Sequence, residues 1–114
     1  MADLTMKTLE TILDISAYRQ KILTSNIANA DTPGYRARDI DFQAELDRAL
    51  ASGGKAGSIA VYEPITTLPN RDGNTVNIDV EMAKIAENSL TYNAATQLMT
   101  MKLRMLKSVI RGGA

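Results

Sequence analysis

The residues best suited to chemistry in this sequence are carboxylates and amides, because histidine and cysteine are both absent. Without histidine, the chain lacks the usual general base and the commonest metal ligand. Without cysteine, it has neither a thiolate metal site nor a disulfide framework. Acid–base or metal chemistry would therefore depend on clusters of acidic side chains.

Two stretches contain such clusters. Asp39, Asp41 and Glu45 lie close enough together to act as paired carboxylates, but capping of a short following helix explains them better. The stretch DGNTVNIDVE (72–81) is rich in oxygen ligands, yet it lacks the alternating acidic positions and the sixth-position glycine of a calcium loop. Neither stretch predicts a catalytic or metal site, so we expect no enzymatic activity and no cofactor.

Binding of nucleotides or nucleic acids is not indicated either. The chain has 13 basic and 13 acidic residues, whereas a nucleic-acid partner normally requires a basic excess. The glycines of SGGKAGS (52–58) lack the strand–loop–helix frame of a phosphate-binding loop. Their composition predicts a flexible linker instead, and we expect neither a small-molecule substrate nor a nucleic-acid partner.

The first long helix is predicted over residues 4–30, where apolar side chains recur at helical spacing. Asp3 is its predicted N-cap. The helix is expected to stop near Pro33, because proline disfavours helical backbone at the preceding residue. Its predicted packing residues are Ile12, Ile15, Ile22 and Leu23.

The second long helix is predicted over residues 79–111, with Asn77 or Asp79 as its N-cap. Apolar residues follow a heptad pattern along it, which is typical of a coiled-coil seam. A second apolar stripe runs beside this seam, from Ala83 to Val109. The predicted packing residues of this helix are Met82, Ile85, Leu90, Tyr92, Leu98, Met99, Leu103, Leu106 and Ile110.

The sequence therefore predicts a mainly α-helical fold, in which long N- and C-terminal amphipathic helices pair as a coiled-coil-like hairpin with an irregular or short-β middle segment. The middle is expected to hold a short helix at 40–50, the linker 52–58 and a β-prone segment interrupted by Pro64. The predicted regions, in chain order, are 1–31, 32–78 and 79–114.

Two apolar stripes on one helix require two neighbours. The N-terminal helix can cover one stripe, and the other would face solvent in a monomer. We favour another subunit as the second neighbour; the alternative is that the short middle helix covers this stripe.

The beginning of the chain, MADLTMKTLETILDI (1–15), lacks the basic start and the apolar run of a secretory signal. No run reaches the roughly 18 apolar residues of a membrane span. We therefore expect a protein that is intracellular or exported by a route without a cleaved signal peptide.

The stretch SNIANADTPGY (25–35) joins the first helix to the middle region. Its asparagine and aspartate side chains can bond to nearby backbone groups and compete with the helix. Extended to SNIANADTPGYRARDIDF (25–42), it resembles the N-terminal signature of bacterial flagellar rod and hook proteins. The matching positions are Ser25, Asn26, Ile27, Ala28, Asn29, Thr32, Pro33, Gly34 and Tyr35.

A second segment, residues 72–110, is similar to the C-terminal half of the same proteins. Within the flagellar basal-body rod protein family, both segments look most like the proximal rod members. The middle, residues 48–70, carries no part of this pattern and is short for the family, which argues against an added surface domain.

The resemblance implies a structural subunit of the proximal rod, which self-assembles with other axial proteins into the periplasm-spanning drive shaft that transmits torque. It implies export through the flagellar type III apparatus without a cleaved signal peptide. It also implies contacts with other copies, other rod proteins, membrane-ring components and a FliE-like adaptor. The alternative function is that of a soluble helical-hairpin chaperone or adaptor of a secretion system.

The resemblance also gives the junction a role, because it places this stretch where the inner helical layer passes to the outer part of the subunit. We expect Asn26, Asn29 and Asp31 to fix the angle at which the chain leaves the helix. Tyr35 is expected to pack this exit against a neighbouring subunit.

Overall fold

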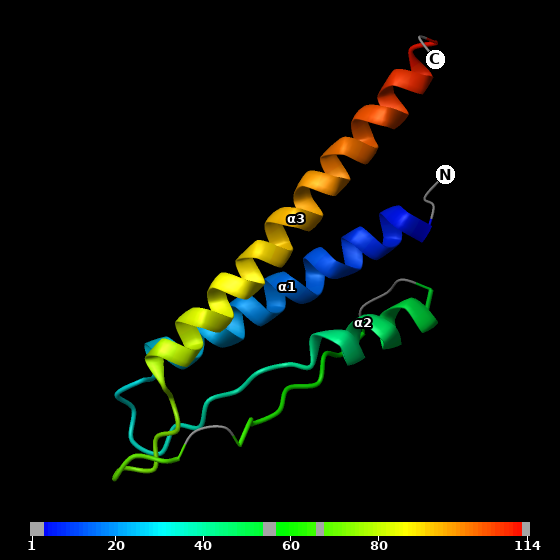
Figure 1. Cartoon of the computed structure of the whole chain (residues 1–114). Helices are drawn as coiled ribbons and strands as arrows, with labels where there is room; N and C mark the ends of the chain where they lie inside the picture. The colour runs from blue at the N-terminus through cyan, green and yellow to red at the C-terminus, as the bar shows by residue number, and fades with distance from the viewer. Residues whose placement is uncertain (1–3, 54–56, 66–67, 113–114) are drawn as a thin grey trace.

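The computed structural model describes residues 4–53, 57–65 and 68–112. Its helices are α1 (Leu4–Ala28), α2 (Phe42–Ala51) and α3 (Ile78–Ile110). Figure 1 shows α1 and α3 side by side and antiparallel, with α2 on the opposite side of α1. The predicted mainly α-helical hairpin is confirmed. The predicted N-cap Asp3 and residues 54–56 of the predicted linker lie outside the described residues.

The helix starts follow from capping side chains. Asp41 precedes α2 and accepts a hydrogen bond from the backbone N–H three residues on, at 3.2 Å. Asn77 precedes α3 and accepts the equivalent bond at 3.3 Å. Each bond satisfies a donor that the first turn of a helix leaves unpaired. Of the candidate caps in the sequence, Asp41 and Asn77 are therefore the N-caps of α2 and α3, and α3 begins at Ile78.

The middle region is largely extended. One antiparallel bridge joins Asp39 to Tyr62, with N–H···O distances of 2.9 Å in both directions. Among the described residues of the β-prone segment, no strand extends beyond this bridge. The middle therefore runs back along α1 as an irregular layer, and the molecule measures 65 × 25 × 17 Å.

The interior of this small fold is unusually polar. Among the described residues, nine buried residues are hydrophobic and nine are polar or charged. Ile15 and Leu23 on α1 are fully buried, as expected for an apolar stripe, but Ser16 and Asn26 on the same helix are fully buried too. Buried polar groups are costly unless they are hydrogen-bonded, so their partners decide how the hairpin is held.

The contact between α1 and α3 uses a different line of α3 from the predicted seam. The buried residues of α3 are Glu81, Asn88 and Ala95, which are spaced seven apart. The predicted seam began one residue later, at Met82, which is 58% exposed. Apolar spacing alone did not find this buried line, because Glu81 and Asn88 are polar; the neighbours of the predicted seam residues stay a prediction.

The predicted packing residues divide accordingly. On α1, Ile15, Ile22 and Leu23 are buried and Ile12 is half-buried. On α3, Ile85 and Met99 are half-buried. The exposed ones are Met82, Leu90, Tyr92, Leu98, Leu103, Leu106 and Ile110. Their contact with another subunit stays a prediction.

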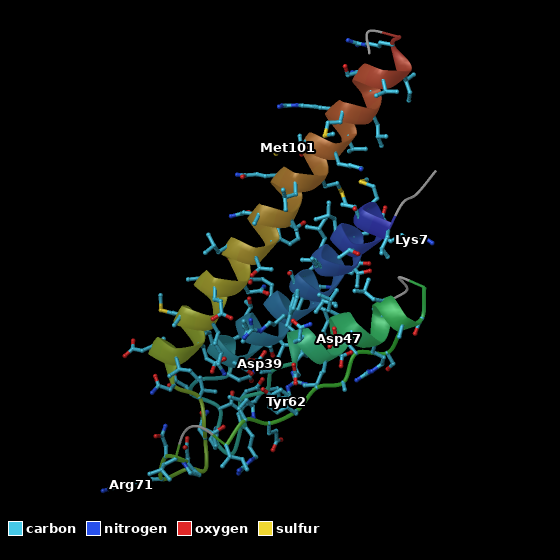
Figure 2. The ribbon with its side chains drawn as sticks, turned by 45° about the vertical axis from the view of Figure 1, so that its right-hand side comes forward. Lys7, Asp39, Asp47, Tyr62, Arg71 and Met101 are labelled. Atoms are coloured by element: carbon cyan, nitrogen blue, oxygen red, sulfur yellow. The ribbon has the colours of Figure 1, made fainter. Side chains whose placement is uncertain are left out.

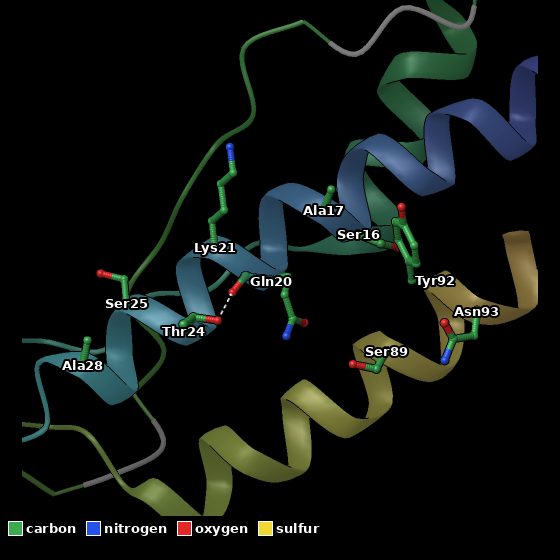
Figure 3. A pocket seen from close by; sticks show the side chains of 10 residues that line it. All are labelled: Ser16, Ala17, Gln20, Lys21, Thr24, Ser25, Ala28, Ser89, Tyr92 and Asn93. Atoms are coloured by element: carbon green, nitrogen blue, oxygen red, sulfur yellow. Dashed lines mark hydrogen bonds between the residues drawn. The ribbon is translucent and has the colours of Figure 1, made fainter.

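The C-terminal part of α3 continues beyond the end of α1 (Figure 1). All residues from 103 to 112 are exposed, and Met101, which precedes them and is labelled in Figure 2, is 57% exposed. The short middle helix does not cover the second apolar stripe of α3, because α2 contacts α1 and not α3 in the part of the chain that the structure describes. None of the described helices is long and apolar enough to cross a bilayer.

Candidate functional site

The stretch that the sequence singled out lies at the closed end of the hairpin, where α1 ends and α3 begins. Asn26, near the end of α1, is its most connected residue. Its amide nitrogen donates to the Arg38 carbonyl and to Oε1 of Glu81, both at 2.7 Å. Its amide oxygen accepts from the Arg38 N–H at 3.0 Å and from the Tyr35 hydroxyl at 3.1 Å. A fully buried amide is thus satisfied on all sides, and it joins α1, α3 and the exit segment.

Asn74, in the loop before α3, closes the end of α1. Its amide nitrogen lies within 2.8 to 3.0 Å of the carbonyl oxygens of Asn29, Ala30 and Thr32. Its amide oxygen accepts from the Val76 N–H at 2.7 Å. These carbonyls belong to the turn that follows α1, which ends at Ala28, so a residue more than forty positions away in sequence fixes the exit turn.

Asn29 shapes the turn from within. Its amide nitrogen donates to the Ser25 carbonyl at 2.8 Å, and its oxygen accepts from the Thr32 hydroxyl at 3.0 Å. The Ser25 carbonyl also accepts the Asn29 backbone N–H at 3.1 Å, so the side chain adds a second bond that holds the turn against the last turn of α1.

Two glycines allow the two loops of the closed end to touch. Gly34 has φ +73° and donates its N–H to the Asp72 carbonyl at 2.8 Å. Gly73 has φ +82°, and a Cβ on it would lie 3.6 Å from the Cα of Gly34. Glycine adopts such left-handed backbone without the steric cost of other residues, so the exit turn is fixed against the loop before α3.

The other members of the predicted signature are distributed around this turn. Tyr35 is half-buried, and its hydroxyl also lies 3.4 Å from that of Ser25. The Tyr35 hydroxyl is thus bound within its own chain; a contact of its ring with a neighbour stays a prediction. Ile27 is half-buried. The exposed members are Ala28, Asp31, Thr32, Pro33 and Gly34.

An ion cluster lies next to the junction, where the exit segment passes between the helices. Arg19 of α1 binds both carboxylate oxygens of Asp39, with distances of 2.9 and 3.1 Å. Lys84 of α3 lies 3.6 Å from the same carboxylate, and Glu87 lies 3.4 Å from Arg19. The side chains of Arg19 and Asp39 are only 11% and 6% exposed, so the pair is shielded from solvent.

The electrostatics favour the charged forms of this pair. Burial by itself raises the pKa of Asp39, but the bonds from Arg19 and the Ile40 N–H, with the charge of Lys84, lower the pKa below its ordinary value. The hydrogen bond to Asp39 raises the pKa of Arg19 against the opposing effect of burial. The cluster therefore joins three segments of the chain through a bidentate pair.

Sequence reasoning missed several residues of this site. Asn74 and Glu81 lie in the stretch weighed as a calcium loop, and Asp39 was interpreted as a cap. The signal for Glu81 and Asn88 was present, because polar residues at heptad spacing often mark a register-setting seam. No local pattern points from Arg19 to Asp39 or from Asn74 to Asn29, since these contacts depend on the tertiary fold.

The hydrogen bonds and ion pairs of this site fix the positions of α1, α3 and the exit segment relative to one another. Within the described residues, no three acidic side chains come together as a metal site would require. Of the paired-carboxylate candidates, Asp39 binds Arg19, Asp41 caps α2, and Glu45 pairs with Arg48 at 2.9 Å. Each carboxylate thus has a structural partner.

Comparison with known proteins identifies the family. The model of the flagella basal body rod protein family matches residues 16–36, which contain the junction. The flagellar basal body rod protein FlgB of Salmonella typhimurium (strain LT2) is 37% identical, and the match covers 97% of this chain and 96% of the relative. FlgB of Cereibacter sphaeroides (strain ATCC 17023) is 43% identical over 82% of this chain and 84% of the relative. FlgB of Escherichia coli (strain K12) is 34% identical over 97% and 96%. The chain therefore belongs to the FlgB family of flagellar basal body rod proteins.

Proposed function

We propose that this chain is a structural subunit of the proximal flagellar rod, assembling with its own copies and with other axial proteins into the drive shaft that crosses the periplasm and transmits torque. The observation that carries the proposal is the apolar surface of α3. Leu98, Met101 and Met105 of α3 are between 53% and 62% exposed. Such surface is a liability in a monomer and a contact in an assembly.

Folding is coupled to assembly in this proposal. An isolated helix is marginally stable in water and is stabilised mainly by packing of its apolar face. The overhanging part of α3 has no such packing within one molecule. Neighbouring subunits would supply it, and binding would provide the free energy for ordering this part.

The same reasoning supports a route through the flagellar type III apparatus, without a cleaved signal peptide. A chain that passes through a narrow channel must unfold, and the uncovered apolar surface of α3 would then gain its packing only after export, in the assembly. The assembled subunit would contact other rod proteins, membrane-ring components and a FliE-like adaptor. Its role would be structural, without catalysis.

The direct test is fractionation of cells that carry an affinity-tagged copy of this chain. We expect the protein in purified basal bodies, together with other rod proteins in a pull-down. Recovery only from the soluble fraction, in cells whose basal bodies are intact, would contradict the proposal. The other function considered from the sequence, a soluble hairpin chaperone, gains no support from the relatives named above, which are rod proteins.

The junction has a separate test within this proposal. The double substitution Asn29→Ala and Pro33→Ala removes the Ser25 and Thr32 contacts and the helix stop, and should let α1 continue past its exit turn. We expect normal export and loss of rod assembly, measured as variant protein in the periplasm of non-motile cells. The matched control, Asn93→Ala with Pro69→Ala, changes exposed positions outside the junction. Normal motility of the junction variant would argue against this role.

A further inference from the structure

The C-terminal end of α3 carries its apolar and its basic side chains on opposite sides. We define residues 103–111 as the α3 tip, and all of them are exposed. At about 100° of rotation per residue, the large apolar side chains of the tip fall within an arc of roughly 160°. These side chains are between 40% and 83% exposed: Leu103, Met105, Leu106, Val109 and Ile110.

The other side of the tip is positively charged. Arg104, Lys107, Ser108 and Arg111 share one face of the helix by their spacing, and they line a hollow of about 320 Å³. The tip contains no acidic residue. None of its three basic side chains forms an ion pair within the described part of the chain. Because arginine and lysine bind phosphate through charge-assisted hydrogen bonds, the hollow suits an anionic group.

The apolar side of the tip is wider than one neighbouring helix requires. A helix that packs on a protein core typically presents an apolar stripe of about 100°. The arc of the tip is roughly 160° wide, and no polar side chain interrupts it. Figure 1 shows the tip beyond the end of α1, at one extremity of the molecule. A broad surface can therefore cover this face more completely than a single helix.

An anionic lipid surface matches both sides of the tip. A helix with Lys and Arg on its polar face and large apolar residues on the other lies in the plane of the membrane interface, with its apolar face in the acyl boundary. Basic residues near such a surface are attracted by the negative charge of the lipids. None of the described helices is long and apolar enough to cross a bilayer, so the tip would lie on the membrane.

We propose that the α3 tip of the free chain binds the surface of membranes that contain anionic lipids. Its apolar arc enters the acyl boundary, and Arg104, Lys107 and Arg111 contact headgroup phosphates. The inference goes beyond the proposed rod function. An assembled subunit would bury the same apolar side chains against its neighbours, so membrane binding belongs to the chain before assembly.

Flotation of the purified full-length chain with lipid vesicles tests the charge of the partner. The wild type should bind vesicles of equimolar phosphatidylglycerol and phosphatidylcholine, should bind pure phosphatidylcholine much more weakly, and should be released as salt is added. The triple variant Arg104→Gln, Lys107→Gln and Arg111→Gln should bind the mixed vesicles about a hundredfold more weakly.

The matched control removes three charges from exposed positions outside the tip, as Lys7→Gln, Lys21→Gln and Arg71→Gln. Both triple variants have the same net charge, so only the position of the charges differs. Circular dichroism checks that both keep the helical content of the wild type. Equal loss of binding in the two variants, or no binding of the wild type to mixed vesicles, would overturn the proposal.

Fluorescence tests which side of the tip enters the lipid. The chain has no tryptophan, so a single introduced one reports its own surroundings. With mixed vesicles, Leu106→Trp, in the apolar arc, should shift its emission to shorter wavelength and become shielded from acrylamide. Ser108→Trp, on the basic side, should change little. The same response at both positions, or none at either, would contradict the proposed orientation.

The result for basal bodies separates this inference from the rod function. If the wild type binds mixed vesicles but is absent from basal bodies, membrane binding stands and the rod function is wrong. If it is found in basal bodies but binds neither kind of vesicle, the rod function stands and the inference is wrong. Loss of the tip variant from basal bodies in that second case would show that the basic face binds a protein instead.

Discussion

At the closed end of the hairpin, Asn26 is fully buried and makes four hydrogen bonds that connect α1, α3 and the exit segment. At the open end, Ile110 is 83% exposed and every residue from 103 to 112 faces solvent. At the closed end, hydrogen bonds within one chain hold the segments together and fix the angles between them. The open end consists of apolar surface that other molecules can cover.

This difference shows how one small chain meets two demands. In the rod subunit that we propose, the chain would leave its inner helix at a defined angle, and directional hydrogen bonds define angles better than apolar contacts do. It must also adhere to its neighbours, and apolar surface provides that without fixed directions. The variants below alter one end at a time, and they are ordered from the largest expected change in stability to the smallest.

Asn26→Ala should have the largest effect, because it removes four bonds and leaves buried partners such as Glu81 and the Arg38 N–H unsatisfied. We expect a loss of about 3 kcal/mol or more in the free energy of unfolding, since each orphaned buried group costs about 1–3 kcal/mol. Urea denaturation followed by circular dichroism measures it. Asn93→Ala, at an exposed position of α3, is the control, with an expected change within about 0.5 kcal/mol. Equal stability of the two variants would show that the closed end is not held by this amide.

Asp39→Asn tests the ion cluster beside the junction. It leaves the shielded Arg19 without its carboxylate, and removing one partner of a buried pair costs about 3 kcal/mol. The exposed Asp47, changed to asparagine in the same way, is the control.

The effect of Asp39→Asn should depend on pH. The folded protein lowers the pKa of Asp39, so the stabilisation is fully present above the unfolded value of about 3.9. It is lost as the pH falls through the folded pKa. Denaturation curves at several pH values should therefore show the gap between wild type and variant closing below about pH 4. If the difference in stability between wild type and Asp39→Asn stays constant down to strongly acidic pH, the lowered pKa of Asp39 is contradicted.

The same contrast explains what the sequence could predict. Helix periodicity and capping predicted three helices close to their observed bounds, because these signals are local. The buried line of α3 was not recognised from the sequence, since two of its members, Glu81 and Asn88, are polar. The partners of Asp39 and Asn29 depend on segments that meet only after folding. The junction was located correctly as a helix stop, but its bonding pattern required the tertiary structure.

Asn88→Leu should stabilise the hairpin rather than weaken it. The substitution removes a buried amide oxygen that has no partner among the described residues and adds apolar contact, at the cost of the bonds to Ser16 and Gln20. Replacing buried polar groups by apolar ones of similar volume is often stabilising, here by about 1 kcal/mol. Thermal unfolding measures the gain. If export requires an easily opened seam, secretion of this variant should fall, whereas Asn93→Leu should be secreted like the wild type.

Changes at the open end should leave the monomer almost unaffected. Met105→Glu changes a residue of α3 that is 62% exposed, so the free energy of unfolding of dilute protein should change by less than about 0.5 kcal/mol. The charge would nevertheless stand in the apolar stripe proposed to meet a second copy. Helicity that rises with concentration in the wild type should then stay flat in the variant, as followed by circular dichroism over a dilution series. A large loss of monomer stability would mean that this part of α3 packs within its own chain, and the contrast between the two ends would disappear.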